Sequence, residues 1–173
     1  MREPEVLHIF FNFHPELCTG CGACVAACMD EHSDFTCCVR HLYRQEKRTK
    51  HGWKLEWCSV ACLHCEASSC AKVCPKKCFS QDAETGTIQL DSTACIGCGA
   101  CKQVCPFDAI TLTADRKADK CDGCIRRLRE GLLPRCVDAC PQAAITIDDR
   151  PALREKSHTE MIDWLQEKKA AEL

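Results

Sequence analysis

Sixteen of the twenty cysteines in this chain of 173 residues fall into four groups with a shared spacing pattern. Each group ends in two cysteines separated by three residues, and a proline follows directly in the last three groups. The groups are Cys18, Cys21, Cys24 and Cys28; Cys62, Cys65, Cys70 and Cys74; Cys95, Cys98, Cys101 and Cys105; and Cys121, Cys124, Cys136 and Cys140. We therefore expect the chain to fold around whatever these thiols bind.

The third group carries the most specific chemistry. Its C-x2-C-x2-C run can wrap three corners of an iron–sulfur cube, and Gly97 and Gly99 let the backbone pass close to it. Cys105 follows Cys101 by four residues, so on a helix the two thiols share a face but point to different places. Pro106 then ends the helical turn. The four groups together predict four [4Fe–4S] clusters held by sixteen cysteines.

Two alternatives for the cysteines are disulfides and zinc. Disulfides are disfavoured because residues 1–5 are charged and contain proline, unlike a signal segment, and because a disulfide framework does not require repeated spacing. The fourth group alone would pass as a zinc ribbon with two separated cysteine pairs. The three-cysteine loops of the first and third groups overfill a zinc half-site, which favours iron.

Composition excludes several classes of function. The formal net charge is −2, and sixteen thiolates with four oxidised clusters would bring it to about −10, which disfavours nucleic-acid binding. No run reaches the ~18 apolar residues of a membrane helix, so we expect a cytoplasmic protein, with export on a partner's signal peptide as an open alternative. No phosphate-binding loop or nucleophile–base pair is found, so we expect no catalytic residue.

Short strands are expected around the cysteine groups. Residues 6–13 are rich in β-forming residues, and the segments 108–113 and 143–148 each follow a Cys-Pro turn. Between the second and third groups, 82–91 reads as a turn at Gly86 leading into a strand. Spacing mildly favours pairing group two with three and group one with four; pairing one with two and three with four stays open.

The segment 29–57 is interpreted as an insertion that is locally basic, with Arg40, Arg44, Lys47, Arg48, Lys50 and Lys54 against Glu46 and Glu56. Tyr43 and Trp53 flank a turn near His51, which predicts a hairpin. Either this hairpin is a solvated arm, or its charge steers an acidic partner toward it.

The tail after Pro151 reads as a helix with Leu153, Met161, Trp164 and Leu165 as its apolar positions. It packs either on its own domain or on a partner subunit. Four cysteines lie outside the groups, namely Cys37, Cys38, Cys58 and Cys78. We interpret them as structural, because free cysteine is often a small buried hydrophobe. His64 is expected to hydrogen-bond a sulfur or the backbone.

The motifs resemble the four-cluster iron–sulfur subunits of the dimethyl sulfoxide reductase type. The likeness rests on the segments 62–75, 95–98 and 120–141, and it extends over 18–148. It implies an α+β fold of two nested two-cluster ferredoxin-like modules with a C-terminal helix. One module spans 1–60 and 107–150 and includes the basic insertion. The second spans 61–106, and 151–173 forms the helical tail.

The resemblance also implies how the cysteines share four clusters. Cluster 1 takes Cys18, Cys21, Cys24 and Cys140; cluster 2 takes Cys28, Cys121, Cys124 and Cys136; cluster 3 takes Cys62, Cys65, Cys70 and Cys105; and cluster 4 takes Cys74, Cys95, Cys98 and Cys101. One departure from the family pattern is Met29, which stands where a proline would follow Cys28.

The shortness of the chain resembles small soluble members that serve a separate catalytic subunit. The resemblance thus implies an electron-transfer subunit in an anaerobic setting. Its expected partners are a molybdenum- or tungsten-pterin catalytic subunit, such as an aldehyde or formate oxidoreductase, and a flavin subunit or ferredoxin. The alternatives are a zinc-binding scaffold and a free polyferredoxin without a fixed partner.

Overall fold

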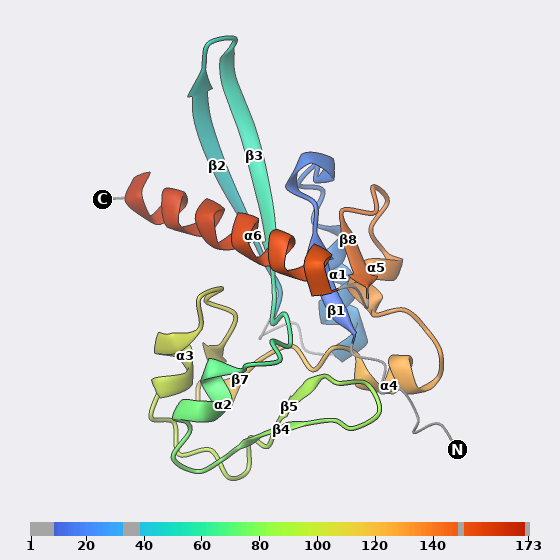
Figure 1. Ribbon diagram of the computed structural model, residues 1–173, viewed down its shortest axis with the longest axis vertical. Coiled ribbons are helices and arrows are strands. Elements are labelled where there is room, and N and C mark those ends of the chain that lie inside the picture. Colours follow the sequence, from blue (N-terminus) through green and yellow to red (C-terminus); the bar gives the residue numbers. More distant parts are fainter. Residues whose placement is uncertain (1–8, 33–38, 149–150, 172–173) are drawn as a thin grey trace.

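The computed structural model describes residues 9–32, 39–148 and 151–171, which form an α+β arrangement of short elements (Figure 1). The side chains of 148, 151–156 and 171 are outside this description. The strands are β1 (Phe10–Phe13), β2 (His41–Thr49), β3 (Gly52–Val60), β4 (Phe79–Gln81), β5 (Ile88–Leu90), β6 (Thr111–Leu112), β7 (Ala118–Asp119) and β8 (Ile145–Asp148). The helices are η1 (Pro15–Leu17), α1 (Ala23–His32), α2 (Ser69–Val73), α3 (Ala100–Val104), α4 (Ile125–Arg129), α5 (Arg135–Asp138) and α6 (Pro151–Ala171).

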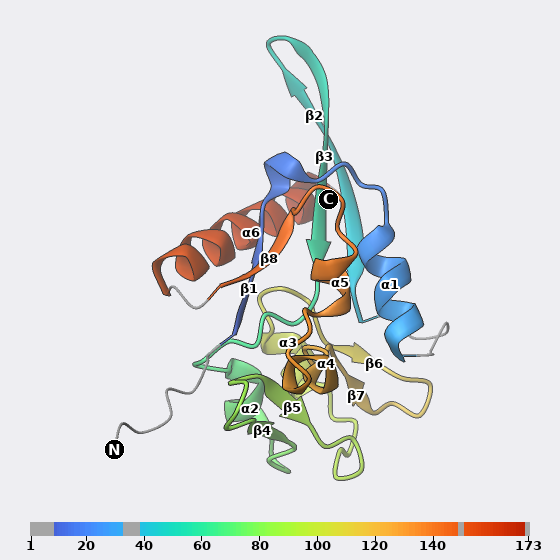
Figure 2. The same ribbon diagram turned by 90° about the vertical axis from the view of Figure 1, so that its right-hand side faces the viewer.

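The strands pair as four separate two-stranded antiparallel sheets: β1 with β8, β2 with β3, β4 with β5 and β6 with β7. The first and last strands thus lie side by side, while β4–β7 pair locally. The helices follow the same division, because α1 contacts α5 whereas α2 contacts α3. In Figure 2, α2, β4, β5 and α3 occupy the lower half, and α1, β1 and β8 occupy the upper half.

The expected strands exist but are shorter than the sequence suggested. β1 begins at Phe10, and residues 6–8 lie outside the described part of the chain. The segments 108–113 and 143–148 become strands only at Thr111 and Ile145. Asp108 and Ala143 take left-handed φ values of 51° and 49° in the turn after each Cys-Pro pair, and such a conformation cannot continue a strand.

Proline decides where the cysteine-bearing helices end. α2, α3 and α5 all end before a Cys-Pro pair, because proline lacks the N–H that a helix interior requires and clashes with its preceding turn. Met29 replaces that proline after Cys28, and α1 accordingly continues to His32.

The main hydrophobic core lies where α6 crosses β1. Met161, Trp164 and Leu165 are buried in the same cluster as Phe11 and Phe13. The Ser157 hydroxyl accepts a hydrogen bond from the Phe13 N–H at 2.9 Å and donates one to its carbonyl oxygen at 3.2 Å. The expected helical tail is therefore confirmed, and these residues pack on their own chain. The Leu153 side chain lies outside the description.

The predicted hairpin is the arm β2–β3, which projects well beyond the body of the molecule (Figures 1 and 2). The boundaries 29–57 were wrong, because α1 runs to His32 and β3 continues to Val60. Arg40 was also misplaced: only 3% of it is exposed, so it belongs to the interior rather than to a solvated arm. Among the described residues, no helix is both long and apolar enough to cross a membrane.

Candidate iron–sulfur cluster sites

Cys18, Cys21, Cys24 and Cys140 line one cavity, which we call site 1. Cys18 caps the end of η1, Cys24 lies in α1, and Cys140 follows α5. The arm supplies part of the wall, and the Cys24 Sγ lies 3.3 Å from the Ser59 Oγ.

Two further cavities hold cysteines from the middle of the chain. Site 3 is lined by Cys62, Cys65, Cys70 and Cys105, and site 4 by Cys74, Cys95, Cys98 and Cys101. α2 and α3 lie against one another and supply the cysteines four residues apart to both cavities. Each of these helices therefore connects the two sites.

The remaining four cysteines, Cys28, Cys121, Cys124 and Cys136, are all buried and form site 2. Cys28 packs with Cys121 in one buried cluster, and Cys136 interacts electrostatically with both Cys121 and Cys124. Cys121 interacts in the same way with Cys62 of site 3. The four sites thus follow one another in a row, with 1 and 4 at its ends.

Backbone amides point at the sulfurs, as a site for a sulfur-bound anionic centre requires. The N–H groups of six residues donate to cysteine Sγ atoms over 3.2–3.5 Å: Cys78 to Cys74, Gly97 and Ala118 to Cys95, Ala109 to Cys105, Gly123 to Cys121, and Ala144 to Cys140. Hydrogen bonds of this kind stabilise thiolates and tune the centres that they hold.

The loops pass so close to their surroundings that a side chain has no room. A Cβ on Gly20 would lie 2.2 Å from the Trp57 ring, and one on Gly97 would lie 2.4 Å from the Arg116 carbonyl oxygen. Both glycines also have positive φ values, which other residues rarely adopt. Trp57 lies in β3, so the base of the arm covers the first loop.

Burial governs the acidity of many of these thiols. It raises the pKa of Cys65 to about 12 and that of Cys70 and Cys124 to about 11, with neighbouring thiols adding to the effect. It also raises the pKa of Cys121 well above its ordinary value. Metal ligands must be thiolates, so the energy of ligation has to offset these raised pKa values.

The spacing of the thiols fits a polynuclear centre better than a single ion. Zinc–sulfur bonds of about 2.3 Å would place tetrahedral sulfurs within roughly 4 Å of one another. Among the described residues, no three cysteine sulfurs lie within 4.8 Å of one another. The donor set, the cavities and the amide groups therefore fit [4Fe–4S] clusters.

Two buried cations lie among the thiols and were not singled out by their sequence. Arg40 donates to the Ser59 hydroxyl over 3.0 Å and interacts with Cys136, Cys121 and Cys24. Lys120 donates to the Cys121 carbonyl oxygen over 2.6 Å. Only the position of Lys120 directly before a cysteine could have hinted at such a role.

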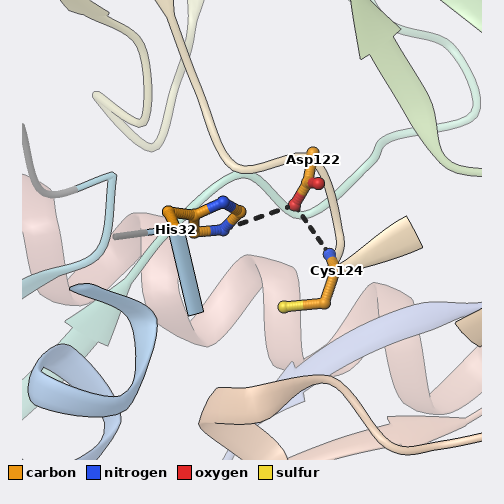
Figure 3. Close-up of side chains that lie close together, drawn as sticks. All are labelled: His32, Asp122 and Cys124. Carbon is orange, nitrogen blue, oxygen red and sulfur yellow. Dashed lines mark hydrogen bonds and ion pairs between the residues drawn. The ribbon is translucent and has the colours of Figure 1, made fainter. Parts of the chain in front are cut away.

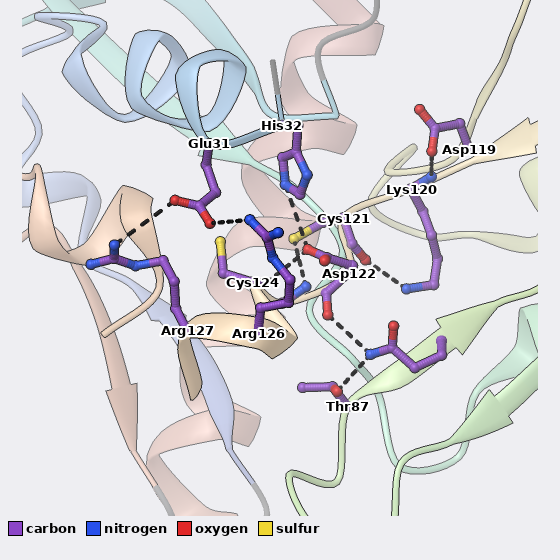
Figure 4. A network of polar contacts seen from close by, with 12 residues as sticks. Glu31, His32, Thr87, Asp119, Lys120, Cys121, Asp122, Cys124, Arg126 and Arg127 are labelled. Carbon is purple, nitrogen blue, oxygen red and sulfur yellow. Dashed lines mark hydrogen bonds and ion pairs between the residues drawn. The ribbon is translucent and has the colours of Figure 1, made fainter. Parts of the chain in front are cut away.

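His32, Asp122 and Cys124 converge beside site 2 (Figure 3). The Asp122 carboxylate accepts the Cys124 N–H at 2.8 Å and lies 3.5 Å from His32. Asp122 thus orders the loop that presents Cys124. Figure 4 extends this network to Glu31, which pairs with Arg126 and Arg127 at 3.7 and 3.8 Å, so that charged side chains join α1 to α4.

His64 accepts the Ile88 N–H on its Nδ1 at 3.0 Å, as expected for a histidine that hydrogen-bonds the backbone. Burial, with Lys120 nearby, holds its pKa well below the ordinary value, so the ring is neutral. Cys58 is buried in the main core. Cys78, by contrast, lies in the wall of site 4. Cys37 and Cys38 lie outside the described residues.

Comparison with known proteins agrees with this arrangement. Residues 53–150 match the model of a 4Fe-4S dicluster domain, and residues 11–28 match that of a 4Fe-4S binding domain. The iron–sulfur subunit of anaerobic dimethyl sulfoxide reductase from Haemophilus influenzae is 36% identical over 87% of this chain and 78% of its own length. The chain belongs to this family of iron–sulfur subunits.

Other relatives have similar names. The corresponding subunit of anaerobic dimethyl sulfoxide reductase from Escherichia coli K12 is 35% identical over 80% of this chain and 72% of its own length. A subunit of tetrathionate reductase from Salmonella typhimurium is 35% identical over 76% of this chain and 54% of its own. As a member of the family of dimethyl sulfoxide reductase iron–sulfur subunits, the protein carries four [4Fe–4S] clusters and is an electron-transfer subunit of an oxidoreductase complex, without a catalytic site of its own.

Proposed function

We propose that sites 1 to 4 each hold one [4Fe–4S] cluster through the four cysteines named for them, and that the row passes single electrons between a catalytic subunit and a redox partner. The observation that carries the assignment is that three of these cysteine sets each line a cavity of their own. When bound, the clusters supply one-electron chemistry, and the chain supplies ligands, spacing and hydrogen bonds.

The nested module arrangement belongs to the same proposal. Sites 1 and 2 would form the outer module, 1–60 with 107–150, and sites 3 and 4 the inner module, 61–106. Pairing of β1 with β8 and contact of α1 with α5 support the outer module. Contact of α2 with α3 supports the inner one.

The ends of the row are suited to exchange electrons with partners. Site 1 contains the exposed Cys21 and site 4 contains the exposed Cys98, whereas all four cysteines of site 2 are buried. We therefore place one partner at each end. Exposed centres would also react with oxygen, in keeping with an anaerobic setting.

The catalytic partner that we propose is a molybdenum- or tungsten-pterin subunit of an anaerobic reductase. The names of the relatives support a reductase of this kind, since they include dimethyl sulfoxide and tetrathionate reductases. An aldehyde or formate oxidoreductase as the partner, and a flavin subunit or ferredoxin at the other end, stay predictions, as does the cytoplasmic location.

The arm is the surface on which this partner would dock. It rises from the wall of site 1, to which Leu42 and Ser59 contribute. Near its tip Trp53 is 75% exposed, and Arg48 and Lys50 have no ion-pair partner among the described residues. An exposed aromatic side chain beside unpaired cations fits an acidic, partly apolar surface.

Anaerobic metal and sulfide analysis tests the cluster assignment. We expect about sixteen iron with matching sulfide, and interacting paramagnetic signals after reduction with dithionite. Zinc without such signals would mean that the chain is a metal scaffold and that the proposed function is wrong.

Co-purification with a molybdenum- or tungsten-containing subunit from the native host tests the partner. The arm variant Arg48→Glu/Lys50→Glu should lose the partner at moderate salt while keeping its iron. Lys169→Glu, an exposed charge reversal on α6, serves as the control and should retain the partner. A wild-type chain that always purifies alone would point to a free polyferredoxin.

A further inference from the structure

The three Cys-Pro turns of the chain share one backbone conformation. The third residue after each final cysteine is left-handed, with φ values of 49°, 51° and 49° at Lys77, Asp108 and Ala143. The N–H of each of these residues donates to the carbonyl oxygen of that cysteine over 3.2 Å. The turns can therefore be compared position by position.

The fourth residue of each turn contacts the cysteine sulfur. Cys78, Ala109 and Ala144 donate their N–H groups to the sulfurs of the preceding cysteines over 3.4, 3.5 and 3.2 Å. All three residues are buried, with at most 5% of their surface exposed. The backbone contact is thus common to the three turns, and only the side chain differs.

At site 4 the difference is a thiol in place of a methyl group. The Cys78 side chain hydrogen-bonds the Cys74 sulfur and lies in the same cavity wall as Cys74, Cys95, Cys98 and Cys101. Cys74 therefore receives hydrogen bonds from both the backbone and the side chain of one residue.

We propose that Cys78 is a positioning residue that donates its S–H to the Cys74 sulfur and thereby raises the reduction potential of the centre at site 4. This inference rests on the proposed function, because it takes Cys74 as a cluster ligand. A hydrogen bond withdraws electron density from a thiolate and favours the more negative, reduced state of the centre that it binds.

The acidities of the two thiols agree with this direction of donation. Burial, the hydrogen bond to Cys74 and nearby negative groups raise the pKa of Cys78 to about 11, so it keeps its proton at neutral pH. Although burial opposes it, hydrogen bonds from Cys78 and from neighbouring amides bring the pKa of Cys74 below its ordinary value. Cys74 is thus the acceptor.

The test is a redox titration of the full-length, cluster-loaded protein, followed by paramagnetic resonance, for the wild type, Cys78→Ala and Cys78→Ser. Alanine occupies the equivalent place in the other two turns, so Cys78→Ala is expected to fold and to retain all its iron. One of the four midpoint potentials should move to a lower value in Cys78→Ala and return toward the wild-type value in Cys78→Ser, because the hydroxyl can donate.

Two outcomes overturn the inference. Unchanged potentials in Cys78→Ala would mean that the thiol only fills space. Loss of about four iron from Cys78→Ala would mean that Cys78 is itself a ligand. Failure of the proposed function gives a different result, because the wild type would then lack iron and sulfide from the start.

Discussion

Individual charged residues inside the protein set the electrostatic environment of the thiol row. Arg40 and Lys120 are 3% and 6% exposed, and both lower the cost of a negative charge at Cys121. Site 2 thus combines four buried cysteines with two buried cations. Such an arrangement favours accepting an electron, because the added negative charge lies near compensating positive charge.

Replacing Arg40 should therefore lower the potential of the centre at site 2. In Arg40→Met we expect a decrease on the order of 1.4 kcal/mol, or about 59 mV for a one-electron couple. Redox titration under anaerobic conditions measures it. Arg44→Met, which removes a charge that is 60% exposed, should leave all the potentials nearly unchanged; an equal shift in both variants would contradict the explanation.

At the scale of single elements, α6 is the main apolar cover of the outer strands. It buries Met161, Trp164 and Leu165 against the core that contains Phe11 and Phe13. Its outer face also meets the arm, because Glu167 pairs with Lys47 and Lys168 lies 5.5 Å from the centroid of the Tyr43 ring. These partly exposed contacts contribute little, so burial holds the helix in place.

Truncating Trp164 tests that conclusion. Trp164→Ala should lower the free energy of unfolding by about 3–5 kcal/mol, since a large side chain with 7% exposure leaves a cavity. Lys47→Met should change it by less than about 1 kcal/mol. Guanidinium unfolding of the loaded protein under argon, followed through the loss of cluster absorbance, compares the two. A larger effect of Lys47→Met would show that the ion pair is the stronger attachment.

Sequence reasoning reached different depths for different elements. The cysteine spacing, Gly86 and the Cys-Pro pairs are local signals, so the turn, the hairpin and the helix ends before proline could be predicted. The burial of Arg40 could not, because a neighbour in space rather than in sequence decides it. The role of Cys78 was missed because it appears only when the three Cys-Pro turns are superposed.

At the scale of the whole molecule, thiol sites replace much of the hydrophobic core. The main apolar cluster lies around β1 and α6, whereas sites 3 and 4 are bordered by short helices and strands of two to five residues. Short elements of this kind are not stable by themselves. The bound centres must therefore supply much of the folding free energy.

Removal of iron should consequently unfold the chain. After chelation under reducing conditions, we expect far-ultraviolet circular dichroism to lose most of its signal and the cooperative melt to disappear. Reconstitution with iron and sulfide should restore both. A metal-free chain that still melts cooperatively would mean that the apolar core alone is sufficient.

The helices that carry cysteines four residues apart have a consequence for assembly. α1, α2, α3 and α5 each hold or adjoin one cysteine of one site and one of its neighbour. Ordering a helix around one site therefore brings a ligand of the next into position and removes part of the entropy cost of filling it. Loading should then spread along the row like the closing of a zip, with partly filled chains scarce between the empty and the complete protein.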